Sequence, residues 1–158
     1  MLLGTALILS WLESLLPFFA GIPGMKLGLP NLAVVLLLYL DTRRTAAVCN
    51  ILRIVLSGLL FGSLFGILFS LAGAFFSFVI MVSLKCIGHF GVTGVSIAGG
   101  VAHNLAQLAV AVFIVRTPGV WYYLPALLVS GAVTGALIGI TAAAVLPYGG
   151  KWFQKGER

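Results

Sequence analysis

Long apolar stretches, separated by short polar or Gly/Pro-rich breaks, make up this chain. About 20 apolar residues in helical form cross a bilayer, and on that measure we predict helices near residues 2–19, 28–41, 45–62, 66–84, 95–115 and 121–147. The second stretch is the shortest, so the pattern defines its ends least well. The chain is therefore expected to be an all-α membrane protein, one domain over residues 1–158 and a compact bundle of six transmembrane helices.

The breaks carry residues that end helices. GIPGMKLGLP (21–30) is rich in Gly and Pro, and Pro30 suits the first turn of the next helix. The others are DTRRT (41–45), GSLFG (62–66), KCIGHFG (85–91), RTPG (116–119) and PYGGK (147–151).

Composition supports lipid as the main solvent, because 61% of the residues are hydrophobic and 8% are charged, against roughly a quarter charged in soluble domains. No Lys or Arg precedes the first apolar stretch and Glu13 lies within it. We therefore expect a retained first span rather than a signal peptide.

The basic residues are scattered singly, which argues against a nucleic-acid surface and suggests an orientation. With the N-terminus inside, the cytoplasmic loops and tail hold Arg43, Arg44, Lys85, Lys151, Lys155 and Arg158. The outer loops hold Lys26 and Arg116, and Trp121 to Tyr123 fall at the outer interface. The positive-inside rule then predicts a multi-pass protein of a cell membrane with both termini in the cytoplasm.

Sequence features of catalysis are missing. The chain has no Walker-type phosphate loop, no DDxxD-like acidic pair for a prenyl diphosphate and no nucleophile elbow. Cys49 and Cys86 lack metal-site spacing. We expect a binding or transport subunit rather than an enzyme, with any ATPase supplied by a partner chain.

Ionisable and small residues in the first and third helices are candidates for function. Glu13 and Arg53 lie within apolar runs, where charge is costly, and Asn50 lies one turn before Arg53. A ligand contact and a structural ion pair both explain them. Ala6, Ser10 and Ser14 line one helix face, which suits either packing within the chain or docking on another subunit.

The segment GGVAHNLAQL (99–108) carries the densest polar signal. His103 and Gln107 are one helical turn apart and Asn104 borders them. Such groups need hydrogen bonds when buried, which other helices or a ligand can supply. His103 could also be an axial ligand to a haem iron, whereas His89 is expected in a cytoplasmic loop.

Four segments give the chain a family resemblance: GMKLGLPN (24–31), LFGSLFG (60–66), SLAGAFFSF (70–78) and GVSIAGGVAHNLAQL (94–108). From about residue 10 to 145 the chain resembles the bacterial Gx transporters, also called heptaprenyl diphosphate synthase component I. That family is similar to the S-components of energy-coupling factor (ECF) transporters, which bind a vitamin or cofactor and join a transmembrane coupling subunit and two ATPase subunits. The resemblance implies that Ala6, Ser10 and Ser14 dock on the coupling subunit.

The resemblance does not settle the ligand, and haem is the one that we expect. His103 would bind the iron, Lys26 and Arg116 the propionates, and Phe75, Phe76 and Phe78 would form an apolar wall. The alternative is a flavin or a quinone or isoprenoid precursor, which would use similar groups without His103. Two roles outside transport are a membrane accessory of prenyl diphosphate synthesis and a structural subunit of a larger complex.

We expect the ligand site in the outer half of the bundle, beneath the 21–30 loop as a lid. Met25 is the alternative soft ligand if His103 lies too deep. The residues expected to bind ligand are His103, Asn104, Gln107, Arg53, Asn50, Asn31, Lys26, Met25 and Arg116.

Overall fold

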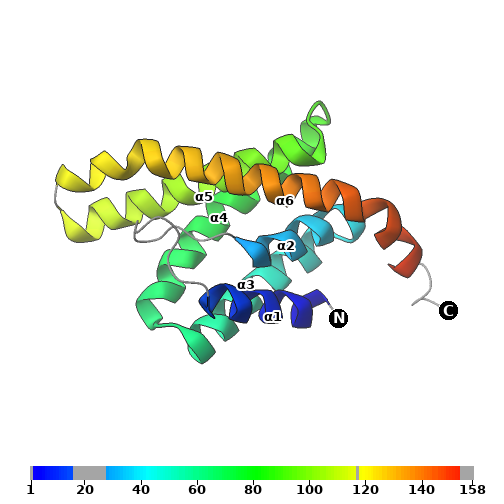
Figure 1. Cartoon of the computed structure of the whole chain (residues 1–158), viewed down its shortest axis with the longest axis horizontal. Helices are drawn as coiled ribbons and strands as arrows, with labels where there is room; N and C mark the ends of the chain where they lie inside the picture. The colour runs from blue at the N-terminus through cyan, green and yellow to red at the C-terminus, as the bar shows by residue number, and fades with distance from the viewer. Residues whose placement is uncertain (1, 16–27, 117, 154–158) are drawn as a thin grey trace.

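A computed structural model describes residues 2–15, 28–116 and 118–153, and the described chain is helical without a strand. The α-helices are α1 (Leu2–Leu15), α2 (Leu29–Leu40), α3 (Arg43–Phe61), α4 (Leu64–Ile87), α5 (Val92–Val115) and α6 (Leu124–Phe153), and the 3₁₀ helix η2 (Pro118–Tyr123) precedes α6. The prediction of an all-helical bundle of six helices is confirmed (Figure 1).

Short polar residues begin and end the middle helices. The Thr42 side chain accepts a hydrogen bond from the Thr45 backbone N–H at 3.1 Å, and Ser63 does the same for Gly66 at 3.1 Å. Both are N-caps, which satisfy a donor that the first helical turn leaves unpaired. Gly88 ends α4 with a φ of 78°, a left-handed conformation that favours glycine.

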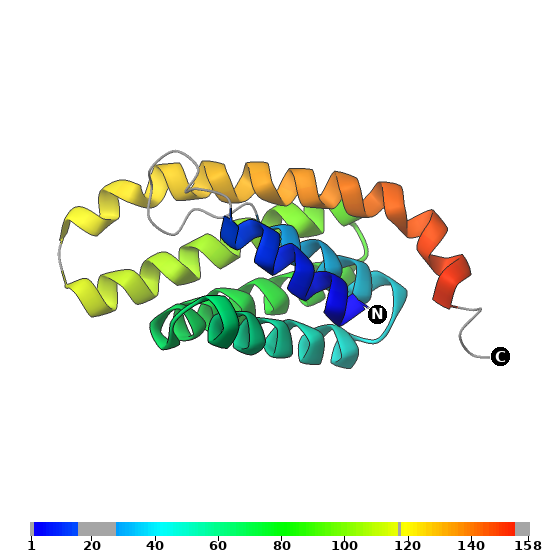
Figure 2. The same cartoon turned by 60° about the horizontal axis from the view of Figure 1, so that its bottom comes forward.

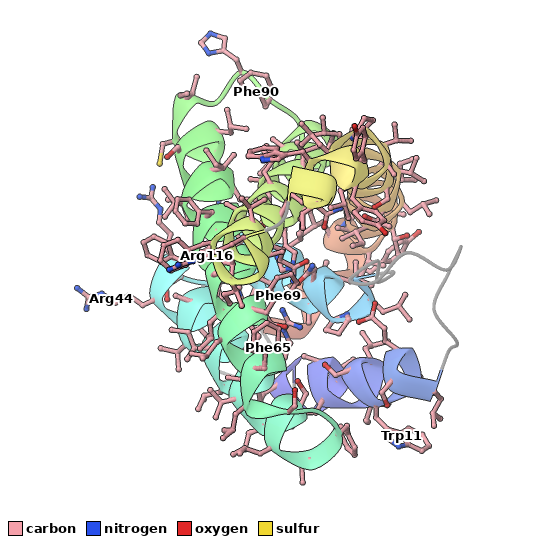
Figure 3. The ribbon with its side chains drawn as sticks, turned by 90° about the vertical axis from the view of Figure 1, so that its left-hand side faces the viewer. Trp11, Arg44, Phe65, Phe69, Phe90 and Arg116 are labelled. Atoms are coloured by element: carbon pink, nitrogen blue, oxygen red, sulfur yellow. The ribbon has the colours of Figure 1, made fainter. Side chains whose placement is uncertain are left out.

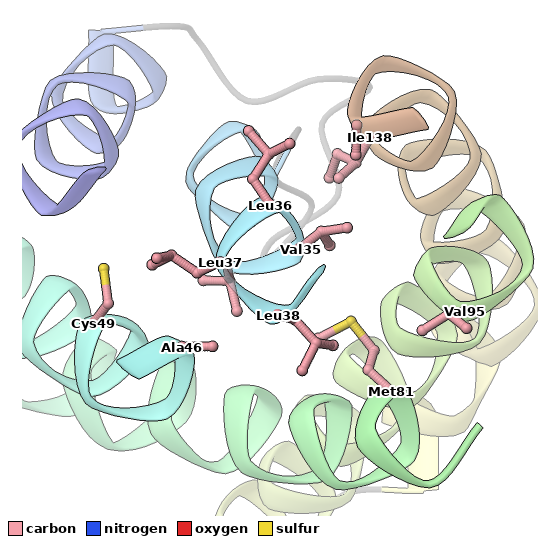
Figure 4. Close-up of a cluster of buried hydrophobic side chains, with 11 residues drawn as sticks. Val35, Leu36, Leu37, Leu38, Ala46, Cys49, Met81, Val95 and Ile138 are labelled. Carbon is pink, nitrogen blue, oxygen red and sulfur yellow. The ribbon is translucent and has the colours of Figure 1, made fainter. Parts of the chain in front are cut away.

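Helix α2 forms the centre of the bundle. Val34, Val35 and Leu38 are at most 1% exposed, and Figure 4 shows α2 surrounded by side chains from its neighbours, among them Met81 of α4 and Val95 of α5. A helix that is apolar on all sides is expected to be buried on all sides. The burial of residues 33–38 places α2 inside the protein rather than against lipid.

Large apolar side chains cover the outside of the other helices. Ile8, Leu64, Leu68 and Phe113 are each at least 60% exposed, and Trp11 points away from the bundle in Figure 3. An outer surface of this kind is stable in lipid and unstable in water. Helices α3 to α6 are long and apolar enough to cross a membrane.

The described parts of α1 and α2 are shorter than a bilayer is thick. Their 14 and 12 residues correspond to about 21 Å and about 18 Å at 1.5 Å per residue, against about 30 Å of hydrocarbon. Helix α2 begins at Leu29, with Gly28 as its N-cap, and alone it is too short to cross the hydrocarbon.

The sixth helix extends further than expected. We predicted an end at Pro147, but α6 continues through Pro147 to Phe153, and its last turns bend away from the helix line in Figure 2. Proline removes one backbone hydrogen bond and kinks a helix without having to end it. Similarly, α4 runs to Ile87, two residues past the predicted break at Lys85.

The helices alternate in direction, so the start of α1 and the end of α6 lie at the same end of the bundle (Figure 1). This agrees with termini on one side of the membrane. That this side is the cytoplasm stays a prediction from the distribution of basic residues.

Candidate functional site

A partly open cavity of about 280 Å³ lies between the helices, and all six α-helices contribute to its wall. The wall is largely apolar, with polar side chains among the lining residues. Six residues expected to carry function from their polarity in apolar runs lie at this wall: Glu13, Asn31, Arg53, His103, Asn104 and Gln107. The structure thus brings together residues separated by up to 94 positions in the chain.

Arg53 of α3 is the buried cation of the cavity, with 8% of its surface exposed. Its Nη2 donates to Asn31 Oδ1 of α2 at 2.9 Å and to Asn50 Oδ1 of its own helix at 2.7 Å. Among the described residues, its Nε has no hydrogen-bond acceptor. Two amide oxygens therefore fix the guanidinium without neutralising its charge.

Glu13 of α1 lies at the same cavity and interacts electrostatically with Arg53. Its carboxylate accepts a hydrogen bond from the backbone N–H of Gly28. Gly28 has a φ of 71° and precedes the first turn of α2, so Glu13 also lies at the positive end of that helix dipole. The sequence suggested an ion pair between Glu13 and Arg53, and the structure places these two opposite charges at one cavity.

The His103 ring of α5 packs against Gly73 of α4. A Cβ atom built at Gly73 would lie 2.8 Å from both Cε1 and Nε2 of His103, closer than packed carbon and nitrogen atoms approach each other. Glycine at position 73 thus leaves the room that the imidazole occupies. Sequence reasoning missed this residue.

Asn104 forms hydrogen bonds between α5 and α6. Its Nδ2 donates to the Leu127 carbonyl at 2.8 Å and to Ser130 Oγ at 3.1 Å, both on α6. Interhelical bonding was one of the two explanations open from the sequence, and it accounts for these two donors. Gln107, one turn below His103, is 6% exposed and lies at the cavity wall.

Other expected ligand contacts lie away from the cavity. Arg116 is an exposed residue with a φ of 52° at the end of α5 and does not line it. Phe75 and Phe76 are 65% and 55% exposed and Phe78 packs on the core around α2. The expected apolar wall for haem is therefore wrong. Met25 and Lys26 lie outside the described residues.

The small-residue face of α1 goes from buried to exposed along the helix. Ala6 is fully buried, Ser10 is half-buried and Ser14 is exposed, and both serines line the cavity. Ser10 Oγ donates to the Ala6 carbonyl at 2.9 Å. Packing within the chain, one of the two explanations from the sequence, describes Ala6 in this structure, whereas docking of this face on a partner stays a prediction.

The sequence analysis also missed the small and hydroxyl residues of the wall. On α5 these are Ser96, Gly99 and Gly100. They could have been found, because they share one helix face with His103 and Gln107 at helical spacing. The remaining hydroxyls at the wall are Ser57, Ser63, Ser70, Ser77 and Thr134.

The polar groups at the cavity wall are suited to binding a ligand. A fixed cation, a carboxylate, an imidazole and amides surround a space between helices, and such convergent polar groups typify ligand sites. The described residues contain no group of three or more His, Cys, Asp or Glu that could hold a metal ion. That finding concerns groups of three or more residues, so it does not test His103 as a single axial ligand to a haem iron.

Comparison with known proteins gives one assignment. No curated protein and no solved structure matches this chain. The family described as heptaprenyl diphosphate synthase component I matches residues 2–145, which include α1 to α5, most of α6 and every residue of the cavity wall. The chain belongs to the heptaprenyl diphosphate synthase component I family.

Proposed function

We propose that this chain is the substrate-binding transmembrane subunit, the S-component, of an ECF-type importer for a cofactor. The observation that supports it is a cavity between the helices with charged and polar side chains at its wall, in a bundle whose outer surface is apolar. Polar and charged side chains within a membrane are costly and mark ligand pathways. The protein is then a binding subunit without catalysis of its own, and its transport energy comes from partner ATPases.

The ligand is small and polar. The cavity of about 280 Å³ is slightly smaller than the roughly 300–1,000 Å³ usual for ligand sites, and Arg53, Glu13 and serine hydroxyls line it. Haem is the second candidate because His103 lies at the wall, and a flavin or a quinone precursor is the third. The outward direction of Phe75 and Phe76 favours the polar ligand over haem.

The family description suggests a different role, that of a membrane accessory to prenyl diphosphate synthesis. Purification of the tagged chain from its own membranes in mild detergent separates the two roles. We expect a transmembrane coupling subunit and two ATPases to copurify, and ATP-dependent uptake of the bound molecule in proteoliposomes. A soluble prenyl synthase copurifying without any ATPase would contradict the transport role.

The same preparation identifies the ligand by mass and absorption spectrum. If haem copurifies, His103→Ala should remove or shift the Soret band, whereas His89→Ala, in the exposed turn between α4 and α5, should not. A colourless ligand of low mass is the outcome that we expect.

A further inference from the structure

We propose that the cavity holds its ligand by an anionic group, a carboxylate or a phosphate, bound to Arg53. This inference rests on the proposed function and narrows the class of substrate that the cavity accepts. Three features of the described residues support it: the unmatched donor of Arg53, the way in which its guanidinium is fixed, and the balance of charge around the cavity.

The first feature is the Nε–H of Arg53. The residue is more than nine-tenths buried and lies at the cavity wall, and its Nε has no acceptor among the described residues. A buried donor without an acceptor costs free energy. Binding of a carboxylate or a phosphate to the guanidinium, whose geometry these groups match, offsets that cost.

The second feature is that neutral groups orient the cation. Asn31 and Asn50 each accept a hydrogen bond from Nη2, and both are amides, so they hold the side chain in place and leave its positive charge in effect. A guanidinium fixed in this way binds an anion without losing further side-chain freedom.

The third feature is an excess of positive potential. Gly28, Pro30 and Asn31, at the start of α2, line the cavity, and the start of a helix carries roughly half a positive charge. Together with Arg53 this exceeds, by roughly half a charge, the one negative charge of Glu13, which is the described carboxylate at the wall. The excess attracts an anionic group in the low-dielectric interior.

A matched pair of probes tests the inference on the full chain in a neutral detergent. Benzoate and benzamide have nearly the same shape and differ in charge. Thermal unfolding is followed at increasing concentrations of each probe, at constant ionic strength. We expect benzoate to raise the melting temperature of the wild-type chain more than benzamide does, and benzoate binding to weaken at least about tenfold in Arg53→Gln, the loss of one charge-assisted hydrogen bond.

Arg116→Gln is the matched control, because Arg116 is exposed and does not line the cavity. It should bind benzoate as the wild-type chain does. Arg53→Lys, which keeps the charge, should retain part of the difference between the probes. If Arg53→Gln does not fold, the comparison of probes on the wild-type chain still decides the question.

Equal responses to both probes, no response to either, or undiminished benzoate binding in Arg53→Gln would overturn the inference. Phosphatidylglycerol in mixed micelles is a third probe. Stabilisation by this lipid alone would assign the anion to a lipid headgroup and overturn the link to an imported ligand. These binding results are independent of whether ATPases copurify, so the anion site and the transport role can fail separately.

Discussion

Arg53 illustrates how a single buried charge is accommodated in an apolar helix. Water is replaced by two amide oxygens, one from the neighbouring helix α2 and one from the preceding turn of α3. The arrangement connects two helices through one cation, and it requires Asn31, Asn50 and Arg53 together. Changing any one of them leaves buried polar atoms of the others without partners.

We expect Asn50→Ala to lower the free energy of unfolding by about 1–3 kcal/mol, because Nη2 of a buried guanidinium loses an acceptor. Thermal or denaturant unfolding of the chain in detergent measures the effect. Thr141→Val is the control, since the Thr141 hydroxyl is exposed and bonds to its own helix at Leu137, and it should unfold like the wild-type chain. Equal stability of Asn50→Ala and the wild-type chain would show that Asn31 alone supports Arg53.

Polar residues in apolar runs were the part of the site that the sequence could predict. Glu13, Arg53 and His103 were each identified because burying them in lipid is costly, and all three lie at the cavity. Phe75 and Phe76 were assigned to the wall wrongly, because in a membrane protein large apolar side chains are equally stable facing lipid. Hydropathy therefore cannot tell the inside of such a bundle from its outside.

At the scale of elements, α5 and α6 form the most extensively packed pair of helices. Gly131, Gly135 and Gly139 recur every fourth residue along α6 and lie against α5. A Cβ built at Gly135 would be 2.7 Å from Ile97 Cα, and one at Gly139 2.6 Å from Thr93 Cα. Glycines at this spacing let two membrane helices approach backbone to backbone, and the signal was present in the sequence although we did not use it.

Gly100→Ala should destabilise the pair strongly, because its Cβ would lie 2.3 Å from the Gly131 carbonyl oxygen, a backbone atom that cannot turn aside. We expect a loss of about 1–3 kcal/mol, the usual cost of an overpacked interface. Unfolding in detergent measures it, with Gly4→Ala as the matched control, since nothing lies within 4 Å of a Cβ at Gly4. A Gly100→Ala chain as stable as Gly4→Ala would contradict the close approach of α5 and α6.

The positions of the helices followed from apolar length and from Gly, Pro and short polar residues, so α2 and α5 ended within one to three residues of their predicted bounds. The same signals did not predict the end of α6. Pro147 and the glycines after it read as a stop, whereas the structure continues the helix past them with a bend. Helix propensity predicts that the helix is weak at Pro147, but it does not predict whether the chain leaves the helix there.

At the scale of the whole molecule, the helices share one core. Helices α4, α5 and α6 pack in sequence on one another, and α2 contacts α1, α3 and α6. The core around α2 takes side chains from α3, α4, α5 and α6, and the cavity takes its wall from all six α-helices.

Cysteine labelling tests the orientation of this molecule in the membrane. In a Cys86→Ser background, Thr42→Cys is placed between α2 and α3 at the end that carries the termini, and Tyr122→Cys at the opposite end, where Tyr122 is 88% exposed. If the termini are cytoplasmic, a membrane-impermeant maleimide should label Tyr122→Cys in intact cells and Thr42→Cys only after lysis. The reverse pattern would contradict the positive-inside assignment.

The central position of α2 also bears on how the protein is made. A helix of about 18 Å is too short to rest across the hydrocarbon alone, and in the finished bundle its side chains contact protein on every side. Helices that span the bilayer can insert one by one and associate afterwards, but α2 has no such independent stage. It must enter together with the helices beside it, so the biogenesis of the central helix depends on the segments synthesised before and after it.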